Sequence, residues 1–118
     1  KNLELYKKYN LIKKIQKTSK IFQDRINEIH NLDLVGNVRH KGMVMGIELV
    51  KNKKSKKPFT AEHSINKIVF EEGRKNNIYF RTLGNIVMLV PPLAISQKDL
   101  NFLLDGTIKT ISALSRKV

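Results

Sequence analysis

The sequence predicts an α+β domain in which helices cover one face of a mainly antiparallel sheet. Three observations predict this class. Apolar residues recur at three- and four-residue spacing near both ends of the chain, two pairs of short strand-like segments lie between them, and each pair is joined by a short turn that contains glycine. Strands joined by hairpins pair antiparallel, and helices gather over their apolar face. The predicted order is therefore α-β-β-α-β-β-α.

The first predicted helix is amphipathic and long. Ser19 fills the one gap in its apolar stripe, which is formed by Leu5, Tyr9, Ile12, Ile15, Phe22, Ile26 and Ile29. A helix that begins near residue 1 and ends at residues 31–33 is about 40 Å long, more than a domain this small can cover. We therefore expect part of this helix to pack against something outside the domain.

The first predicted hairpin joins strands at 34–38 and 43–50 through a turn at 39–42. In the second strand, apolar residues occupy every other position: Met43, Met45, Ile47 and Leu49. Gly46 lies on the opposite face, where the missing side chain allows close approach of another backbone or a bulge. A lysine-rich loop at 51–57 follows.

Thr60 is the predicted N-cap of the second helix, which Asn76 and Asn77 end because Asn tolerates the left-handed conformation. The next hairpin joins strands at 78–81 and 86–90, with a turn at 82–85.

Two features mark the last helix. Pro91 and Pro92 end the preceding strand, and Ser96 with Asp99 three residues later reads as an N-cap with an acidic residue in the first turn. The apolar stripe of the helix comprises Leu100, Leu103, Leu104, Ile108, Ile111 and Leu114. Gly106 is expected to weaken the middle of this helix by roughly 1 kcal/mol relative to alanine.

Length and composition favour one domain over residues 1–118. The chain is 41% hydrophobic and contains no cysteine, which excludes a disulfide framework, a zinc knuckle and a thiol nucleophile.

The chain has no apolar run long enough to span a bilayer, so we expect a cytoplasmic protein. The first residue is Lys1 instead of Met, which indicates a processed chain or one cut from a longer protein.

The net charge of +13 raises the possibility of nucleic-acid binding. The excess is scattered: residues 1–30 hold eight basic and three acidic residues, the loop at 51–57 holds five lysines, and the rest holds ten basic and seven acidic residues. A phosphate-binding surface usually adds arginine and interleaved aromatics, whereas this excess is lysine. A solvated lysine surface is therefore favoured, with a stand-alone basic nucleic-acid-binding domain kept as an alternative.

Self-contained chemistry is not evident in the sequence. His30, His40 and His63 have no metal-ligand spacing, and no serine lies in a nucleophile motif. We predict neither a catalytic residue nor a metal site within this chain.

Several motifs nevertheless resemble the C-terminal portion of class III pyridoxal-phosphate aminotransferases. The matching segments are Val35-Gly36-Asn37-Val38-Arg39, Gly42-Met43-Val44-Met45-Gly46-Ile47-Glu48-Leu49-Val50, Lys57-Pro58-Phe59, Phe80-Arg81-Thr82-Leu83-Gly84-Asn85 and Leu89-Val90-Pro91-Pro92-Leu93. The resemblance extends from Leu5 to Leu114. The loop before Pro58 is most similar in length to the biotin-biosynthesis branch, which transfers an amino group from S-adenosylmethionine to 8-amino-7-oxononanoate. Ornithine-type, glutamate-semialdehyde and ω-amino-acid transaminases share much of the same frame.

The resemblance implies that the chain is the small C-terminal domain of a fold-type I enzyme. In the family, pyridoxal phosphate and its Schiff-base lysine belong to a large domain that precedes this one, and two subunits form a homodimer. The substrates are a small amino donor and a keto acceptor. No lysine of this chain is therefore assigned a catalytic or cofactor-binding role, and the chain alone is expected to be inactive.

Arg81 is the one residue to which the resemblance gives a substrate-binding role. An arginine at this motif position binds the substrate carboxylate in the family, and a guanidinium suits that task because its planar fork makes two charge-assisted hydrogen bonds. The alternative is an exposed arginine at a strand end. Thr82 stands where the family usually has proline, so we expect a less rigid hairpin. Arg39 also matches a family position, but a turn arginine that pairs with an acid or caps a helix explains it equally well.

Overall fold

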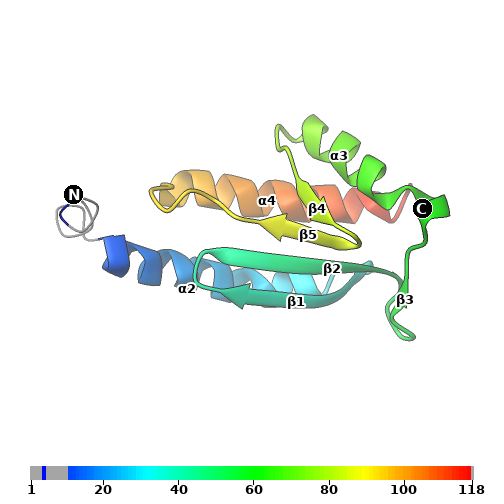
Figure 1. Ribbon diagram of the computed structural model, residues 1–118, viewed down its shortest axis with the longest axis horizontal. Helices are drawn as coiled ribbons and strands as arrows, with labels where there is room; N and C mark the ends of the chain where they lie inside the picture. Colours follow the sequence, from blue (N-terminus) through cyan, green and yellow to red (C-terminus); the bar gives the residue numbers. More distant parts are fainter. Residues whose placement is uncertain (1–3, 5–10, 118) are drawn as a thin grey trace.

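The computed structural model describes residue 4 and residues 11–117, so Leu5 and Tyr9 of the first predicted helix lie outside the described residues. The elements follow one another in the predicted order, with one short strand and one 3₁₀ turn added (Figure 1). They are α2 (Leu11–His30), β1 (Val35–Lys41), β2 (Val44–Asn52), β3 (Lys57–Pro58), a 3₁₀ helix (Ala61–His63), α3 (Ile65–Lys75), β4 (Arg81–Leu83), β5 (Ile86–Leu89) and α4 (Gln97–Leu114).

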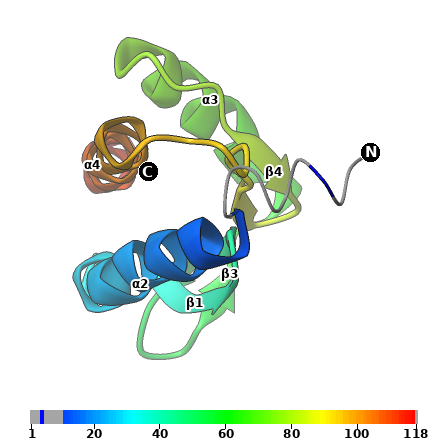
Figure 2. The same cartoon turned by 90° about the vertical axis from the view of Figure 1, so that its left-hand side faces the viewer.

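The sheet is antiparallel throughout. Its strands lie in the order β1-β2-β5-β4, and β3 pairs with the end of β2. Helices α2 and α4 lie side by side over one face, and α3 packs on α4 (Figure 2). The opposite face carries no helix among the described residues. This arrangement confirms the predicted α+β class.

The core lies between the sheet and the helices α2 and α4. Alternate residues of β2 point into it as predicted, and Met45, Ile47 and Leu49 are fully buried. The other fully buried side chains that meet them include Phe22, Ile29, Val35, Leu100, Leu104, Ile111 and Leu114. Met43 is also buried, whereas Met88 is only half-buried.

The first hairpin turns later than predicted. Arg39 and His40 belong to β1, because they pair with Gly46 and Met45 of β2, and the turn falls at 41–44 with Gly42 at a φ of 58°. The prediction for Gly46 was also wrong. A Cβ there would lie 3.5 Å from Ile86 and 3.8 Å from Met88, which is ordinary contact, and the irregularities of β2 pairing lie elsewhere in the strand.

Helix boundaries follow the predicted signals except at the start of α3. Thr60 precedes the 3₁₀ helix, and α3 begins only after Ser64, which has a left-handed φ of 49°. Asn77 has a left-handed φ of 61° just beyond the end of α3, as predicted. The hydroxyl oxygen of Ser96 accepts a hydrogen bond from the backbone N–H of Asp99 at 3.1 Å, which confirms the N-cap of α4.

Two helical glycines mark where the chain segment after α3 crosses α3 and α4 at close range. A Cβ on Gly106 would lie 2.1 Å from the end of the Ile78 side chain. A Cβ on Gly73 would lie 2.4 Å from the ring of Phe80 and 2.8 Å from the carbonyl oxygen of Ile78. Gly106 is expected to weaken the helix relative to alanine, but a larger residue at this position would collide with the side chain of Ile78.

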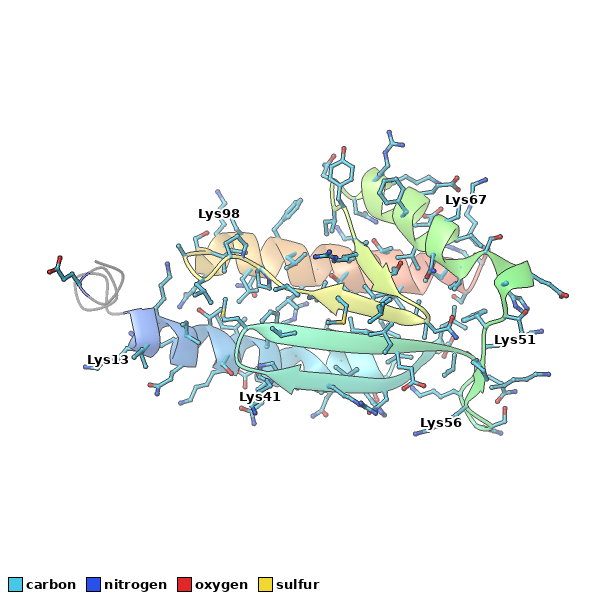
Figure 3. All side chains as sticks on the ribbon, viewed as in Figure 1. Lys13, Lys41, Lys51, Lys56, Lys67 and Lys98 are labelled. Carbon is cyan, nitrogen blue, oxygen red and sulfur yellow. The ribbon has the colours of Figure 1, made fainter. Side chains whose placement is uncertain are left out.

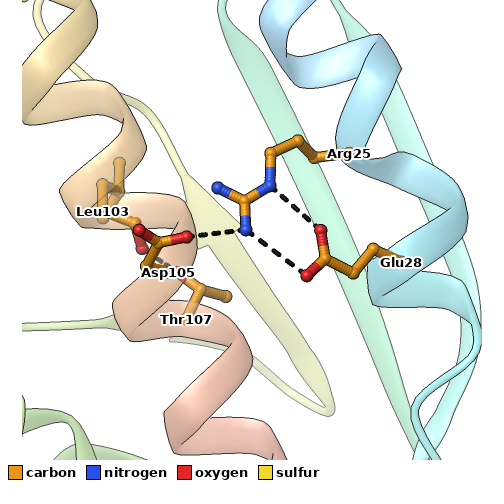
Figure 4. Close-up of polar contacts among 5 residues, drawn as sticks. All are labelled: Arg25, Glu28, Leu103, Asp105 and Thr107. Atoms are coloured by element: carbon orange, nitrogen blue, oxygen red, sulfur yellow. Dashed lines mark hydrogen bonds and ion pairs between the residues drawn. The ribbon is translucent and has the colours of Figure 1, made fainter.

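An arginine joins the two helices that cover the sheet (Figure 4). The guanidinium of Arg25 in α2 lies 2.7 Å from the carboxylate of Asp105 in α4 and 3.1 Å from that of Glu28. Burial works against the charge, but the hydrogen bonds and the attraction of the two carboxylates together raise the pKa of Arg25. Lys53 makes a second tie, since its ammonium donates to the carbonyl oxygens of His30 and Leu32 after α2 ends.

The remaining positive charge is scattered, as predicted. Lysines that point outward lie on α2, β1, β2, the loop before β3, α3 and α4 (Figure 3). None of the lysines in the loop at 51–57 forms an ion pair within the described part of the chain. This distribution fits a solvated lysine surface.

Replacement of Gly73 by alanine tests the close crossing. Alanine ordinarily stabilises a helix, but here its methyl group would press against a backbone carbonyl that cannot rotate away. We expect Gly73→Ala to lower the free energy of unfolding by about 1–3 kcal/mol, measured by urea denaturation. Ser112→Ala, at an exposed position of α4, is the matched control and should leave stability nearly unchanged. Equal stability of Gly73→Ala and the wild type would contradict the crossing.

Glu72 gives the fold a pH dependence with a definite sign. Its carboxylate accepts a hydrogen bond from Lys75 at 2.9 Å and lies 3.8 Å from the ammonium of Lys117. The hydrogen bond from Lys75 lowers the pKa of Glu72, burial opposes it, and the charges of Lys75, Lys117 and Arg116 lower it further. A carboxyl group whose pKa is lower in the folded state stabilises the fold above its ordinary pKa and loses that contribution on acidification.

We therefore expect Glu72→Gln to be less stable than the wild type near neutral pH. The difference should shrink as the pH falls through the lowered pKa of Glu72, because both proteins then carry a neutral side chain at this position. Urea denaturation over a pH series measures it. A constant difference at every pH would show that packing, and not charge, causes the loss.

Candidate functional site

A slot opens where the β4–β5 hairpin loses its pairing. Arg81 and Met88 form the last cross-strand pair, and beyond them residues 77–80 and 90–92 diverge. The space between the two segments has a volume of about 410 Å³. We call this space the Arg81 slot; it is lined by Asn77, Ile78, Tyr79, Phe80, Arg81, Met88, Leu89, Val90, Pro91, Pro92, Ile95, Phe102 and Leu103.

Local sequence explains why the two segments separate. On one side, the left-handed backbone at Asn77 redirects the chain as it leaves α3. On the other side, Pro91 and Pro92 have no N–H and cannot continue a ladder of hydrogen bonds with β4. The N-terminal half of α4 contributes Phe102 and Leu103 to the wall. Secondary-structure termination on both sides thus produces the slot.

Arg81 provides the positive charge of this site. It is the one charged residue among the described residues that line the slot, and its guanidinium forms no hydrogen bond or ion pair within the described part of the chain. A guanidinium that has no partner can donate two parallel hydrogen bonds to an incoming carboxylate. The site is therefore suited to bind an anionic group next to apolar surface.

The sheet register places Arg81 and Arg39 on the same face. Arg39 of β1 lies opposite Gly46, which lies opposite Met88, which lies opposite Arg81. Directly opposed residues point to the same side of a sheet, here the side without a helix. Three strand spacings separate the two arginines, a distance of about 14 Å between their Cα atoms. Arg39 does not line the slot.

Arg39 lies within β1 instead of in a turn, and among the described residues it forms no pair with an acid and caps no helix. Thr82, the departure next to Arg81, lies opposite the buried Val87 and so points toward the core. The side chain of Thr82, which stands where the family usually has proline, therefore does not line the slot.

The histidines have structural surroundings. His40 Nε2 lies 2.9 Å from the carbonyl oxygen of Gly42 and 3.2 Å from the hydroxyl of Ser19, which ties β1 to α2. His63 Nδ1 accepts a hydrogen bond from the backbone N–H of Thr60 at 3.1 Å. No cluster that could hold a metal ion occurs among the residues described.

Sequence reasoning missed the aromatic walls of the slot. Tyr79 and Phe102 are 77% and 53% exposed, an unusual state for side chains of this size. Phe102 could have been noticed because it lies off the apolar stripe of α4, so an inward position was never open to it. Tyr79 gave no comparable signal, since it lies in the segment predicted as a strand at 78–81.

Comparison with known proteins assigns the chain to a family. The model of the aminotransferase class-III family matches residues 1–111, so this chain belongs to that family. In the part that the structure describes, no helix is both long and apolar enough to cross a membrane.

The chain is similar to particular members of this family. It is 38% identical over 109 residues to adenosylmethionine-8-amino-7-oxononanoate aminotransferase of Methanocaldococcus jannaschii, covering 92% of this chain and 24% of that protein. For the enzyme of the same name from Geobacter sulfurreducens the identity is 33% over 114 residues, covering 97% and 25%. The chain therefore spans about a quarter of the length of these relatives.

Solved structures agree with this similarity. The crystal structure of the Methanocaldococcus jannaschii enzyme superposes with a TM-score of 0.87 at 37% identity, covering 94% of this chain and 25% of that one. A pyridoxamine-phosphate (PMP)-bound aminotransferase from Vibrio fluvialis superposes with a TM-score of 0.86 at 24% identity, covering 93% and 24%, and supports the fold alone. The resemblance of the sequence motifs to class III aminotransferases is thereby confirmed.

Proposed function

We propose that this chain is the small C-terminal domain of a class III aminotransferase that transfers an amino group from S-adenosylmethionine to 8-amino-7-oxononanoate in biotin biosynthesis. The names of the relatives at 33–38% identity support the choice of substrates. The observation that carries the proposal is Arg81, a cation at the end of an apolar slot that has no ion-pair partner among the described residues. Its role in the enzyme is to bind the carboxylate of the acceptor and so orient the distant keto group.

The residues present do not fit pyridoxal phosphate. An attachment site for this cofactor needs a lysine for the Schiff base and further donors for a phosphate group. The described residues that line the Arg81 slot include no lysine and one cation. We propose that the cofactor is held by the large domain, outside this chain. The small domain formed by this chain would contribute to substrate recognition, and a second subunit would complete a homodimer.

In this proposal Arg81 orients the acceptor for the reaction. A carboxylate held by two parallel hydrogen bonds loses its freedom to rotate, so the rest of the acceptor is aimed in one direction. The exposed position of Arg81 on the helix-free face keeps it accessible to a ligand that arrives from outside the domain. The family assignment favours this enzyme role over a stand-alone nucleic-acid-binding domain.

The direct test of the proposal is an assay of the full-length protein. Amino transfer from S-adenosylmethionine to 8-amino-7-oxononanoate should be detected by mass spectrometry of the diamino product. Ornithine, glutamate semialdehyde and ω-amino acids should be poor substrates under the same conditions. Faster turnover of one of these compounds would reassign the protein within the family.

The chain of residues 1–118 alone should neither bind pyridoxal phosphate stoichiometrically nor catalyse amino transfer. An absorbance titration followed by borohydride reduction and peptide mapping measures this. The many surface lysines will give weak, dispersed adducts, which the number of modified sites distinguishes from a true site. One saturable adduct on a single lysine would contradict the assignment of the cofactor to another domain.

Replacement of Arg81 in the full-length enzyme tests its role with the acceptor. Arg81→Ala should raise the KM for 8-amino-7-oxononanoate and lower kcat/KM. The decrease in kcat/KM should correspond to a loss of about 2–4 kcal/mol of transition-state stabilisation, because the substitution removes the charged partner of a desolvated carboxylate. Arg81→Lys should restore only part of this loss, since an ammonium cannot reproduce the two-pronged geometry. Cofactor content should be unchanged.

The methyl ester of the acceptor is the control for charge. Wild type and Arg81→Ala should differ little with the ester, which lacks the anion. An equal loss with acid and ester would mean that Arg81 supports the hairpin, and the substrate-binding role would then be wrong.

A further inference from the structure

Asn76 makes side-chain contacts that its backbone position does not require. It follows α3 directly, with a φ of −99° and a ψ of 14°, a turn conformation that most residue types adopt. The change of chain direction belongs to the next residue, Asn77, whose φ is 61°. The reason for an asparagine at residue 76 therefore lies in its half-buried side chain.

The amide group of Asn76 joins the end of α3 to α4. Its Nδ2 donates to the carbonyl oxygen of Glu72 at 3.2 Å and to the hydroxyl oxygen of Thr110 at 3.0 Å, 34 residues further along the chain. Thr110 is fully buried, and its hydroxyl donates its own hydrogen to the carbonyl oxygen of Gly106 at 2.7 Å. Both groups that face Asn76 are thus acceptors, so this position needs a side chain that supplies two N–H bonds.

This contact lies at the start of the segment that leads to Arg81. Ile78 crosses Gly106 at close range, and the two residues before Arg81 belong to neither α3 nor β4. The direction in which the segment enters β4 therefore depends on where α3 ends relative to α4. The hydrogen bond between Asn76 and Thr110 fixes that relative position.

Helix α4 takes part in both the asparagine contact and the Arg81 slot. Its first half contributes Phe102 and Leu103 to the wall of the slot. Thr110 lies about two turns after Leu103 in the same helix. A hydrogen bond that holds the end of α3 on Thr110 therefore also fixes the start of the segment that carries Arg81 relative to this wall.

We propose that Asn76 and Thr110 are positioning residues for Arg81, which they keep aimed at the carboxylate of the acceptor; this role rests on the proposed function of Arg81 and adds how the fold holds it. Neither residue lines the slot, so both act through the segment at 77–80. Without the hydrogen bond, the end of α3 can shift on α4, and the guanidinium then points in more directions. The bond can bias these directions by no more than its own contribution, about two- to tenfold.

A second buried threonine of α4 provides the matched control. Thr107 is fully buried, and its hydroxyl donates to the backbone carbonyl oxygen of Leu103 at 2.7 Å, within its own helix. Thr107→Val and Thr110→Val therefore each remove a buried hydroxyl and a hydrogen bond within α4. Only Thr110→Val also removes a bond to the end of α3. A difference between the two variants thus reports the contact with Asn76 and not the loss of a threonine.

The first experiment measures the position of the segment without a substrate. It uses the ¹⁵N-labelled chain of residues 1–118, whose described part contains its own core, and the amide spectrum also reports the folded state. Residual dipolar couplings give the direction of each N–H bond. We expect Thr110→Val to change these couplings at residues 79–81, whereas Thr107→Val leaves them unchanged and Thr110→Ser, which keeps a hydroxyl, restores them. Wild-type couplings at 79–81 in Thr110→Val would overturn the proposal.

The second experiment measures function in the full-length enzyme. Thr110→Val should lower kcat/KM for 8-amino-7-oxononanoate about two- to tenfold, mainly through a higher KM, while kcat/KM for its methyl ester changes little. A role in stability alone would lower the amount of active enzyme and so reduce both values equally. Thr107→Val should keep the wild-type ratio of acid to ester, and Thr110→Ser should restore it.

Substitutions of Asn76 show whether the two residues act together. Asn76→Ala should reproduce the effect of Thr110→Val on the acid-to-ester ratio, and the double variant should lose no more than either single variant, because each breaks the same bond between them. Asn76→Asp should lower the ratio further than Asn76→Ala, because a carboxylate oxygen would face two acceptors. Additive losses in the double variant would show that the residues act separately, and the positioning pair would then be wrong.

Arg81→Ala separates failure of the positioning pair from failure of the proposed function. If Arg81→Ala abolishes the preference for acid over ester but Thr110→Val behaves as Thr107→Val does, Arg81 binds the carboxylate and the pair does not position it. If Arg81→Ala leaves the preference unchanged, the proposed role of Arg81 is wrong, and the positioning role fails with it whatever the dipolar couplings show.

Discussion

The rest of the structure depends on the pairing of β2. This strand pairs with β1, β5 and β3, and its alternate residues Met45, Ile47 and Leu49 form the centre of the core. Because side chains alternate along a strand, a shift of pairing by one residue would move this whole apolar set to the helix-free face. The same register fixes β5 against β2 and β4 against β5, which in turn places Arg81 on the open face. Core packing and the direction of the candidate site are thus one constraint.

The helices that pack on the buried face of the sheet stabilise this register. Helices α2 and α4 cover the buried face and are joined by the guanidinium of Arg25, while the segment after α3 crosses Gly73 and Gly106 at close range. That crossing determines where the chain enters β4. The position of the slot therefore follows from contacts on the core side of the sheet, although the slot and its arginine are exposed.

The surface divides into two kinds. Most of the net charge of +13 comes from lysines scattered over the fold, and those labelled in Figure 3 point outward from α2, β1, β2, the loop before β3, α3 and α4. The helix-free face and the Arg81 slot differ, since they combine exposed apolar groups with arginine. Arginine binds planar anions in pairs of hydrogen bonds, whereas a solvated ammonium on a flexible stem has no preferred partner. This contrast explains why a strongly basic chain has its candidate site at one arginine.

The sequence by itself determined the fold class, the order of the elements, the buried face of β2 and the cap at Ser96, and it named Arg81 as the candidate substrate-binding residue, because each depends on local periodicity, on a cap or turn residue, or on a motif that the family shares. The tertiary structure alone decided the rest. The extension of β1 through Arg39, the row that joins Arg39 to Arg81 and the close approach at Gly73 depend on pairing and crossing partners far along the chain. The slot arises in the same way: Tyr79, Val90 and Phe102 line one space only because the segment after α3, the end of β5 and the helix α4 meet there.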